Sequence, residues 1–512
     1  MKKFITNIRT LAALLIASAT FVACSSDDDI LNDPMGKYTL TVSAQKGEAQ
    51  PALDEVKGDN TTRGLSLDDK TLNAVWKDGE TVEVYNASDE KIAELTPTAT
   101  GTASTTLTGT VTGTMPNVGD ALTLKFLSPD YDSQDGTLAY IESHCDYATA
   151  GVTVSSVSGS NITTDVANFV NQQAIVKFTL VDKADGTTKL NPTTFTITWF
   201  IDQDHEEEVV KLTNIPAATY EANGDGVLYV ALPAISNNLV LLAANVGDNM
   251  YTMEKAGVTF ANGQYYAITA KTEKYDALNT PLTILITNIK NTDKFHFANR
   301  ASGPVYYTIN GGERQEIGAN DESEFVVKPG DKVAFYGDNA TYGSSTKSSS
   351  CGTKNSQGNF YIYGNIMSLV SSEDYATATE LTGTYTFYKM FSENWFMRNH
   401  PYKKIMLPAT TLTQYCYASM FYKCEDLEEA PDLPALTGKK YCYQKMFQNC
   451  YSLNSIKCLV KNTQASGRSI TEDWVPTGTS SGTIITNKAC TNWPKGSSGI
   501  PSGWTQIAID VE

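Results

Sequence analysis

The chain has 512 residues, of which 57 are acidic and 39 basic, so its formal charge at neutral pH is −18. A surface this acidic repels phosphate backbones, which argues against nucleic acid as a partner. Hydrophobic residues make up 41% of the chain and charged residues only 19%, so intrinsic disorder is excluded. At this length we expect several domains.

Residues 1–23 have the pattern of a secretory signal peptide. A basic start precedes a mostly apolar run, from Leu11 to Ala23, which is too short to span a bilayer stably. The following residues resemble a bacterial lipobox, with Phe21 where leucine is usual, and the resemblance implies acylation of Cys24. A plain signal peptide with a chance cysteine is the alternative. No later stretch approaches the length of a membrane-spanning helix, so we expect the lipid to be the sole membrane attachment.

Residues 24–36 are predicted to form an acidic tether. Cys24 is followed directly by Ser-Ser-Asp-Asp-Asp at residues 25–29. One interpretation is a solvated spacer between the membrane and the fold. The run also resembles the acidic export signal of surface lipoproteins in Bacteroidota. We therefore expect a surface-exposed lipoprotein of the cell outer membrane.

From residue 37 to about residue 370, short apolar runs alternate with period two and are separated by Gly- and Thr-rich turns. This pattern is typical of antiparallel β-sandwiches. We expect one sandwich at 37–165, a second at 166–275, and a small β-domain or cap at 280–372. Clear alternating runs are Tyr38, Leu40 and Val42; Val176, Phe178 and Leu180; and Phe195, Ile197 and Trp199.

Four segments in this region resemble strands of fimbrillin-like surface proteins. They are Asn73–Val84, with Glu80 where aspartate is usual, Phe169–Phe178, Leu228–Ala234 and Phe260–Tyr266. The resemblance covers roughly residues 35–275. It implies two tandem transthyretin-like β-sandwiches, the architecture of pilin subunits that polymerise by lending a strand to a neighbour.

Arg63 and Gly64 lie in a polar, glycine-flanked stretch that we expect to be an accessible loop. In fimbrillins an arginine in this region is the place where a protease removes the leading strand and opens a groove for a donor. The resemblance therefore implies processing between Arg63 and Gly64. An ordinary loop arginine is the alternative.

A repeat occupies residues 373–465. Tyr415–Leu427 recurs as Tyr441–Leu453, and a degenerate earlier copy contains Met390 and Phe391. The pattern resembles the BspA-type leucine-rich repeats of bacterial surface proteins, which implies a short solenoid. In such repeats one Asn or Cys donates a buried hydrogen bond to the turn backbone. The resemblance assigns this ladder position to Asn394, Cys424 and Cys450. Because each repeat covers only its neighbour's core, we expect caps at both ends, the second at 466–512.

The cysteines and tyrosines of the repeats are the remaining candidates. Cys416 and Cys442 occupy equivalent positions, and the ~4.8 Å spacing of stacked strands is compatible with a disulfide or with two free thiols. No zinc spacing is present, and we expect no metal and no cofactor. Aromatic rings suit sugars and protein hot spots alike. The candidate ligand contacts are Tyr415, Tyr417, Tyr422, Tyr441 and Tyr443.

Candidates for catalysis fail on geometry. His144, Cys145 and Asp146 would point to alternate faces of a strand, and the acidic run at 202–208 lacks the spacing of a calcium loop. We expect no enzyme. The predicted function is adhesion, with the chain as a tip or accessory fimbrial subunit. Its expected partners are other fimbrial subunits, joined by strand exchange, and host or microbial proteins or glycans, bound through the C-terminal repeats. The alternative is a surface lipoprotein that captures glycans for nutrient uptake.

Overall fold

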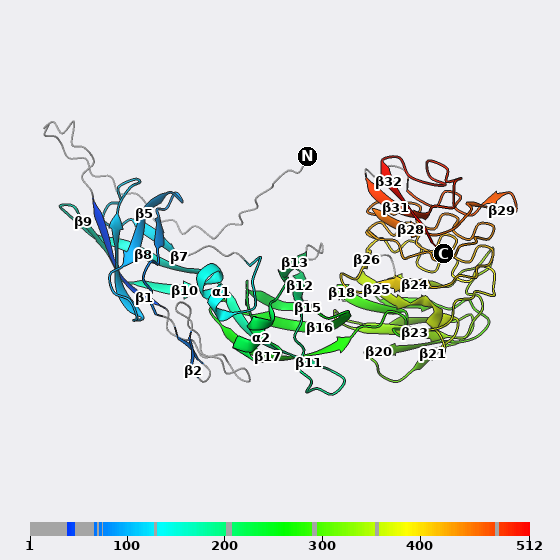
Figure 1. Ribbon diagram of the computed structural model, residues 1–512, viewed down its shortest axis with the longest axis horizontal. Coiled ribbons are helices and arrows are strands. Elements are labelled where there is room, and N and C mark those ends of the chain that lie inside the picture. The colour runs from blue at the N-terminus through cyan, green and yellow to red at the C-terminus, as the bar shows by residue number, and fades with distance from the viewer. Residues whose placement is uncertain are drawn as a thin grey trace.

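The computed structural model describes residues 38–46, 66–68, 71–73, 75–126, 131–200, 207–288, 294–353, 358–476 and 481–511. Strands dominate, so the predicted mainly-β class is confirmed. The molecule is elongated, with a first and a second β-domain followed by a larger C-terminal body (Figure 1). Within the described residues, no helix has both the length and the apolar character needed to cross a membrane.

The first β-domain is an eight-stranded arrangement that closes on itself, because β1 pairs with β6 on one side and with β9 and β10 on the other. Buried residues alternate along β1, as expected for a strand with one face on the core. The strands are β1 (Thr39–Lys46), β4 (Val82–Tyr85), β5 (Lys91–Pro97), β6 (Ser104–Thr110), β7 (Ala121–Phe126), β8 (Ala148–Ser158), β9 (Asn161–Thr164) and β10 (Ala167–Asn171), with a separate hairpin of β2 (Ser66–Asp68) and β3 (Thr71–Asn73).

The first β-domain extends beyond the expected boundary at residue 165. Strand β10 pairs with β1 and β8, and Phe169 packs edge-on against the buried Trp76 with ring centroids 5.8 Å apart. The segment Phe169–Phe178, which resembled the opening strand of the second domain, is therefore divided between the two domains. Its first half belongs to the first core, and only the part from Ala174 onward enters the second sheet.

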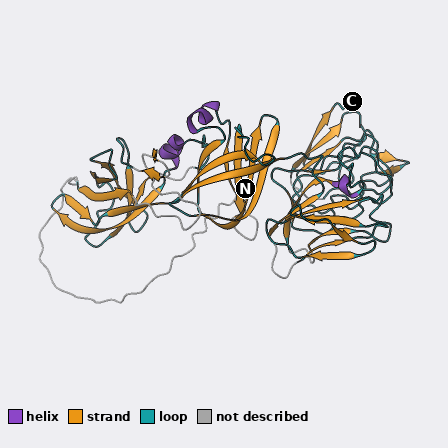
Figure 2. Ribbon diagram, turned by 90° about the horizontal axis from the view of Figure 1, so that it is seen from below, coloured by secondary structure: helices purple, strands orange, loops and turns teal. Residues whose placement is uncertain are grey.

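The second β-domain is a seven-stranded sheet in the order β13-β12-β15-β16-β17-β11-β14. A segment of the first domain crosses to it, because Ile141 and Cys145 pack against Tyr229 and Tyr265. This segment holds α1 (Leu138–Tyr140) and the π-helical turn Ile141–Cys145, near the helix α2 (Ala217–Asn223) (Figure 2). The strands are β11 (Ala174–Asp182), β12 (Thr194–Phe200), β13 (Glu207–Leu212), β14 (Val227–Leu232), β15 (Ile235–Val246), β16 (Asn249–Phe260) and β17 (Tyr265–Lys274).

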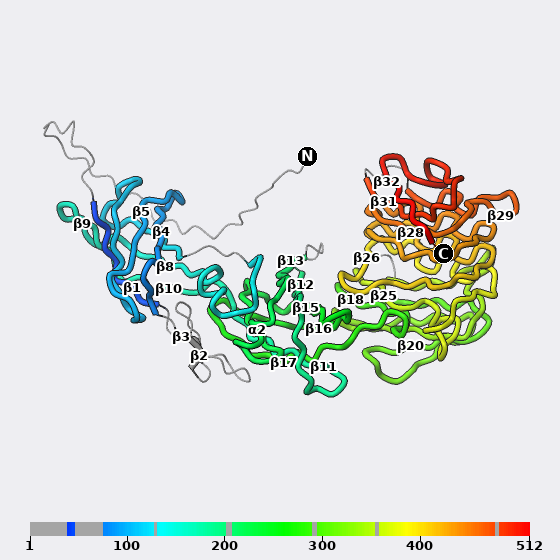
Figure 3. The backbone as a smooth tube through the Cα atoms, in the orientation of Figure 1, coloured from blue at the N-terminus to red at the C-terminus, as the bar shows by residue number. Residues whose placement is uncertain are grey.

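The C-terminal body has one continuous hydrophobic core, which runs from Leu282 to Trp504. Two sheets form its base, and stacked coils rise from them (Figure 3). The base strands are β18 (Thr283–Asn288), β19 (Phe295–Ala298), β20 (Val305–Ile309), β21 (Gln315–Ile317), β22 (Glu322–Phe325), β23 (Lys332–Gly337), β24 (Ser350–Thr353) and β25 (Asn359–Asn365), followed by the 3₁₀ turn Ile366–Leu369, β26 (Met397–Asn399) and β27 (Ile405–Met406).

Parallel strands continue the coils to the end of the described chain. In the last sheet β31 pairs in parallel with both β28 and β32. These elements are β28 (Ser455–Cys458), β29 (Gln464–Ala465), β30 (Arg468–Ser469), β31 (Gly482–Asn487) and β32 (Trp504–Ile509). The segments expected as cap, repeats and second cap thus share one core instead of forming separate units.

Candidate functional site

Three successive coil segments, residues 385–394, 415–424 and 441–450, form one face of the stack. The amide of Phe387 donates to the carbonyl of Cys416 at 2.7 Å, and that of Tyr417 donates to the carbonyl of Cys442 at 3.0 Å. Further along, the amide of Phe421 donates to the carbonyl of Met446 at 3.0 Å. Each coil is therefore held to the next by backbone hydrogen bonds, as neighbouring strands are in a sheet.

Every fourth residue of these segments has a positive φ although it is not glycine. In the first segment the residues are Tyr385, Lys389 and Glu393, with φ of 57°, 56° and 66°. The equivalent residues of the other two segments share this conformation: Tyr415, Ser419, Lys423, Tyr441, Lys445 and Asn449. A left-handed backbone is energetically unfavourable for any residue other than glycine. Because it recurs at equivalent positions in all three segments, it is a property of the coil itself.

The inner side of the coils is an aromatic stack. Phe387, Tyr417 and Tyr443 lie ring on ring, with centroids 5.7 and 6.1 Å apart. Tyr417 and Tyr443 are each only 1% exposed, so the prediction that they contact a ligand is wrong. The left-handed residues at 415 and 441 turn the chain, and therefore residues two apart do not share a face as they would on a strand.

The three residues at the expected ladder position donate hydrogen bonds to backbone carbonyls: Cys424 and Cys450 to the preceding coil, and Asn394 to β24 and to its own turn. Asn394 donates from Nδ2 to the carbonyls of Cys351 and Phe391, both at 2.9 Å. The thiol of Cys424 donates to Phe391 O at 3.1 Å, and that of Cys450 to Phe421 O at 3.0 Å. Gly352 is required beside this site, because a Cβ there would lie 1.8 Å from Asn394 Oδ1.

The outer side carries a row of half-buried tyrosines. Tyr385 and Tyr415 stack with centroids 4.7 Å apart and planes 6° from parallel, and Tyr441 follows 5.1 Å from Tyr415. Tyr388 meets Tyr385 at right angles, and Lys440 Nζ lies over the Tyr441 ring, 5.1 Å from its centroid. The ring faces are therefore covered by neighbours. Tyr385 is not among the predicted ligand contacts, although it precedes Tyr415 by 30 residues, the same offset that separates Asn394 from Cys424.

Lysines accompany this row. Lys389 lies 5.3 Å from the centroid of the Tyr388 ring, and Lys423 lies 5.4 Å from that of Tyr422, which is half-buried. Lys423 also pairs with Glu393 at 3.4 Å. The tyrosine–lysine face, as we call this surface, is defined by Tyr385, Tyr388, Lys389, Tyr415, Tyr422, Lys423, Lys440, Tyr441 and Lys445.

Strand β1 fills the core of the first β-domain. Leu40 and Val42 are fully buried, and Lys46 is 2% exposed. The Lys46 ammonium lies 3.2 Å from the Glu80 carboxylate and 4.4 Å from the centroid of the Trp76 ring. Glu80, which departs from the usual aspartate, thus ties β1 to the loop before β4.

Among the other predicted site residues, Cys24, Arg63 and Gly64 lie outside the described residues. Cys416 and Cys442 are free and buried, so no bridge joins them. Burial raises the pKa of the Cys416 thiol to about 12, which keeps it protonated and unreactive. No group of three or more potential metal ligands occurs in the described part of the chain.

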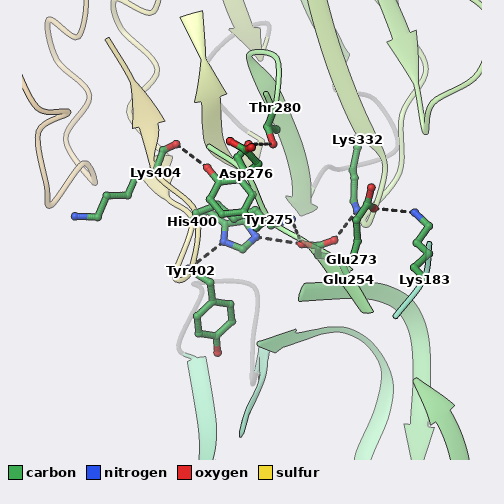
Figure 4. A network of polar contacts seen from close by, with 11 residues as sticks. Lys183, Glu254, Glu273, Tyr275, Asp276, Thr280, Lys332, His400, Tyr402 and Lys404 are labelled. Carbon is green, nitrogen blue, oxygen red and sulfur yellow. Dashed lines mark hydrogen bonds and ion pairs between the residues drawn. The ribbon is translucent and has the colours of Figure 1, made fainter. Parts of the chain in front are cut away.

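A buried ionic cluster joins the second β-domain to the C-terminal body (Figure 4). Glu254 of β16, whose side chain is 3% exposed, lies 2.5 Å from the ammonium groups of both Lys332 and Lys403. His400 Nε2 lies 3.6 Å from Glu254, while its Nδ1 accepts a hydrogen bond from the Tyr402 amide at 3.1 Å. The acid comes from one domain and its partners from the other, so the cluster fixes their relative position.

The electrostatics of this cluster follow from burial and pairing. Burial lowers the pKa of His400 to about 4, so the ring is neutral at neutral pH. Because Nδ1 accepts a hydrogen bond, the single ring proton is assigned to Nε2, facing Glu254. Burial alone would raise the pKa of Glu254, but the His400 contact and the two lysines outweigh it and hold that pKa well below its usual value. No sequence signal pointed to this site, since Glu254 and His400 are far apart in the chain.

No family model matches the chain, and no curated protein matches it. Among solved structures, a candidate cell adhesion protein from Bacteroides fragilis aligns with 45% of this chain and 92% of its own length, at 14% identity and a TM-score of 0.27. Another, from Bacteroides eggerthii, aligns with 48% of this chain and 88% of its own length, at 11% identity and a TM-score of 0.24. A shaft pilin from Lactobacillus rhamnosus aligns with 47% of this chain and 99% of its own length, at 10% identity and a TM-score of 0.20. Likenesses this weak do not establish a shared fold, so function must be argued from the chain's own residues.

Proposed function

We propose that the chain is a cell-surface adhesin that contacts its ligand through the tyrosine–lysine face. The observation that carries the proposal is the position of this face. It is partly solvent-exposed, rigidly stacked, and located on the C-terminal body, while the first β-domain lies at the opposite end of the elongated molecule (Figure 1). We further propose that the coils are leucine-rich repeats of the BspA type and that acylated Cys24 anchors the chain at the outer membrane.

The N-terminal half would serve as a stalk of two fimbrillin-like sandwiches. Cleavage between Arg63 and Gly64 would separate β1 from the rest of the chain. Loss of β1 removes the buried side chains of Leu40 and Val42 and leaves an open groove between β6 on one side and β9 and β10 on the other. Such a groove accepts a donor strand from another subunit through main-chain hydrogen bonds. The C-terminal body suits a tip or accessory subunit, because it occupies the end that a shaft pilin uses for polymerisation.

Two experiments test this proposal. Adherence to immobilised host and microbial surfaces is measured for cells with and without the protein, and we expect the producing cells to adhere more. Mass spectrometry of surface-extracted protein should find an acylated chain beginning at Cys24, a processed chain beginning at Gly64, or both. Equal adherence of the two cell types would refute the adhesin. A native chain without either terminus would refute the anchoring scheme.

Surface glycan capture for nutrient uptake is the second candidate function. The observation that favours it is the regular row of tyrosines, since evenly spaced phenols suit a polymer with a regular repeat. It predicts that loss of the protein slows growth on a polysaccharide and leaves adherence unchanged.

A further inference from the structure

The tyrosine row presents ring edges to solvent instead of ring faces. Tyr385 and Tyr415 cover one another, Tyr415 and Tyr441 do the same at a 31° tilt, and Lys440 covers the outer face of Tyr441. The edge of an aromatic ring carries partial positive charge, and a phenol can donate a hydrogen bond. The row is therefore a poor platform for stacking a neutral sugar and a suitable surface for electron-rich oxygens.

The charge of this surface is opposite to that of the whole chain. Residues 384–394, 414–424 and 439–449 contain five lysines and one acid, a net charge of +4, whereas the chain carries −18. The acid, Glu393, is paired with Lys423. Acidic residues lie just beyond these segments: Glu425 and Asp426 directly follow the second, and Glu472 lies in the turn that follows the third coil. A localised positive surface on an acidic protein attracts an anionic ligand.

The spacing of the row selects among anionic polymers. Its steps are 4.7 and 5.1 Å. An extended peptide advances by about 3.3 Å per residue and repeats a side-chain direction only after about twice that distance, so an acidic peptide falls out of step with the row. One sugar ring of an extended linear polysaccharide advances by about one step of the row, so successive sugars meet successive tyrosines.

We propose that the tyrosine–lysine face binds an extended, linear, anionic polysaccharide, one that carries carboxylate or sulfate groups. The ammonium groups of Lys389, Lys440 and Lys445 pair with the acidic groups of the ligand, and the phenols of the tyrosine row donate hydrogen bonds to its oxygens. This proposal rests on the proposed function, in which the same face is the contact surface, and it adds the chemical class of the ligand.

Binding of the full chain to heparin and polygalacturonate, with neutral dextran and the acidic peptide polyglutamate for comparison, tests the proposal. We expect both anionic glycans to bind and added salt to weaken them, because screening reduces charge pairing. The triple variant Lys389→Glu/Lys440→Glu/Lys445→Glu should bind at least about tenfold more weakly. The control Lys211→Glu/Lys255→Glu/Lys461→Glu changes net charge equally at exposed sites elsewhere and should bind within about twofold of the unmodified chain.

A second variant removes the hydroxyls without removing the stack. Tyr385→Phe/Tyr415→Phe/Tyr441→Phe should weaken heparin binding several-fold and leave the melting temperature unchanged. Equal binding of dextran or polyglutamate, or equal losses in both lysine variants, would overturn the proposal. If no glycan binds but cells with the protein still adhere, the ligand class is wrong and the adhesin stands. If heparin binds but adherence is absent, the adhesin fails and the ligand class stands.

Discussion

Replacing Glu254 by glutamine tests whether the buried ionic cluster locks the second β-domain to the C-terminal body. The variant removes the negative charge that lies 2.5 Å from both Lys332 and Lys403, and the Lys403 side chain is only 7% exposed. Breaking a buried ion pair by removing one partner costs about 3–5 kcal/mol, because the remaining charge stays buried without compensation. For domains of this size that loss lowers the melting temperature by on the order of 10 °C.

The assay is thermal unfolding of the full chain, followed by circular dichroism, with Glu273→Gln as the matched control. Glu273 lies close to the cluster, but its side chain is 63% exposed and pairs with Lys183 at the surface (Figure 4). We expect the control to shift the melting temperature by about 2 °C or less. The double variant Glu254→Gln/Lys403→Met should recover much of the loss, since it removes the stranded charge. Equal shifts for Glu254→Gln and the control would refute the reasoning.

The same cluster predicts how stability depends on pH. The folded-state pKa of His400 is about 4, below its unfolded value of about 6.5, so the unfolded chain takes up a proton first as the pH falls. Stability is therefore fully present above pH 6.5 and declines toward pH 4, with a slope approaching about 1.4 kcal/mol per pH unit. The depressed pKa of Glu254 adds a loss in the same direction at lower pH. Urea unfolding between pH 5 and 7 measures the slope, and His400→Gln should flatten it.

Three further predictions concern the coils. Lys445 has a φ of 53°, which glycine adopts freely, so Lys445→Gly should raise the free energy of unfolding by up to about 1 kcal/mol. Lys439 does not have a positive φ, so the control Lys439→Gly should lower it. Thermal melts of the two variants test this difference. Asn394→Ala should lower the free energy of unfolding, measured in urea, by about 2–3 kcal/mol. Cys424→Ala should lower it by less, because Phe391 O still accepts the hydrogen bond from Asn394. Iodoacetamide should leave the buried Cys351, Cys416, Cys424, Cys442, Cys450 and Cys458 unmodified in the native protein, and rapid labelling of any of them, read by mass spectrometry, would contradict their burial.

Local sequence patterns predicted the parts of the fold that depend on local interactions. Period-two alternation indicated the strands, and the offset between Tyr415 and Tyr441 indicated the stacked segments. The opposite orientations of Tyr415 and Tyr417 could not be predicted, because they depend on a left-handed residue that no glycine marks. The cluster around Glu254 could not be predicted either. Its residues come from β16, the start of β23 and the loop before β27, and only the packing of two domains brings them together.

Adhesion by oriented beads tests the central claim most directly. Residues 24–512 are coupled to beads either through their N-terminus or through their C-terminus, and retention on a ligand-bearing surface is measured under flow. Because the contact face belongs to the C-terminal body, beads coupled through the N-terminus should be retained and beads coupled through the C-terminus should wash away. Equal retention of the two populations, or retention of neither, would contradict the account.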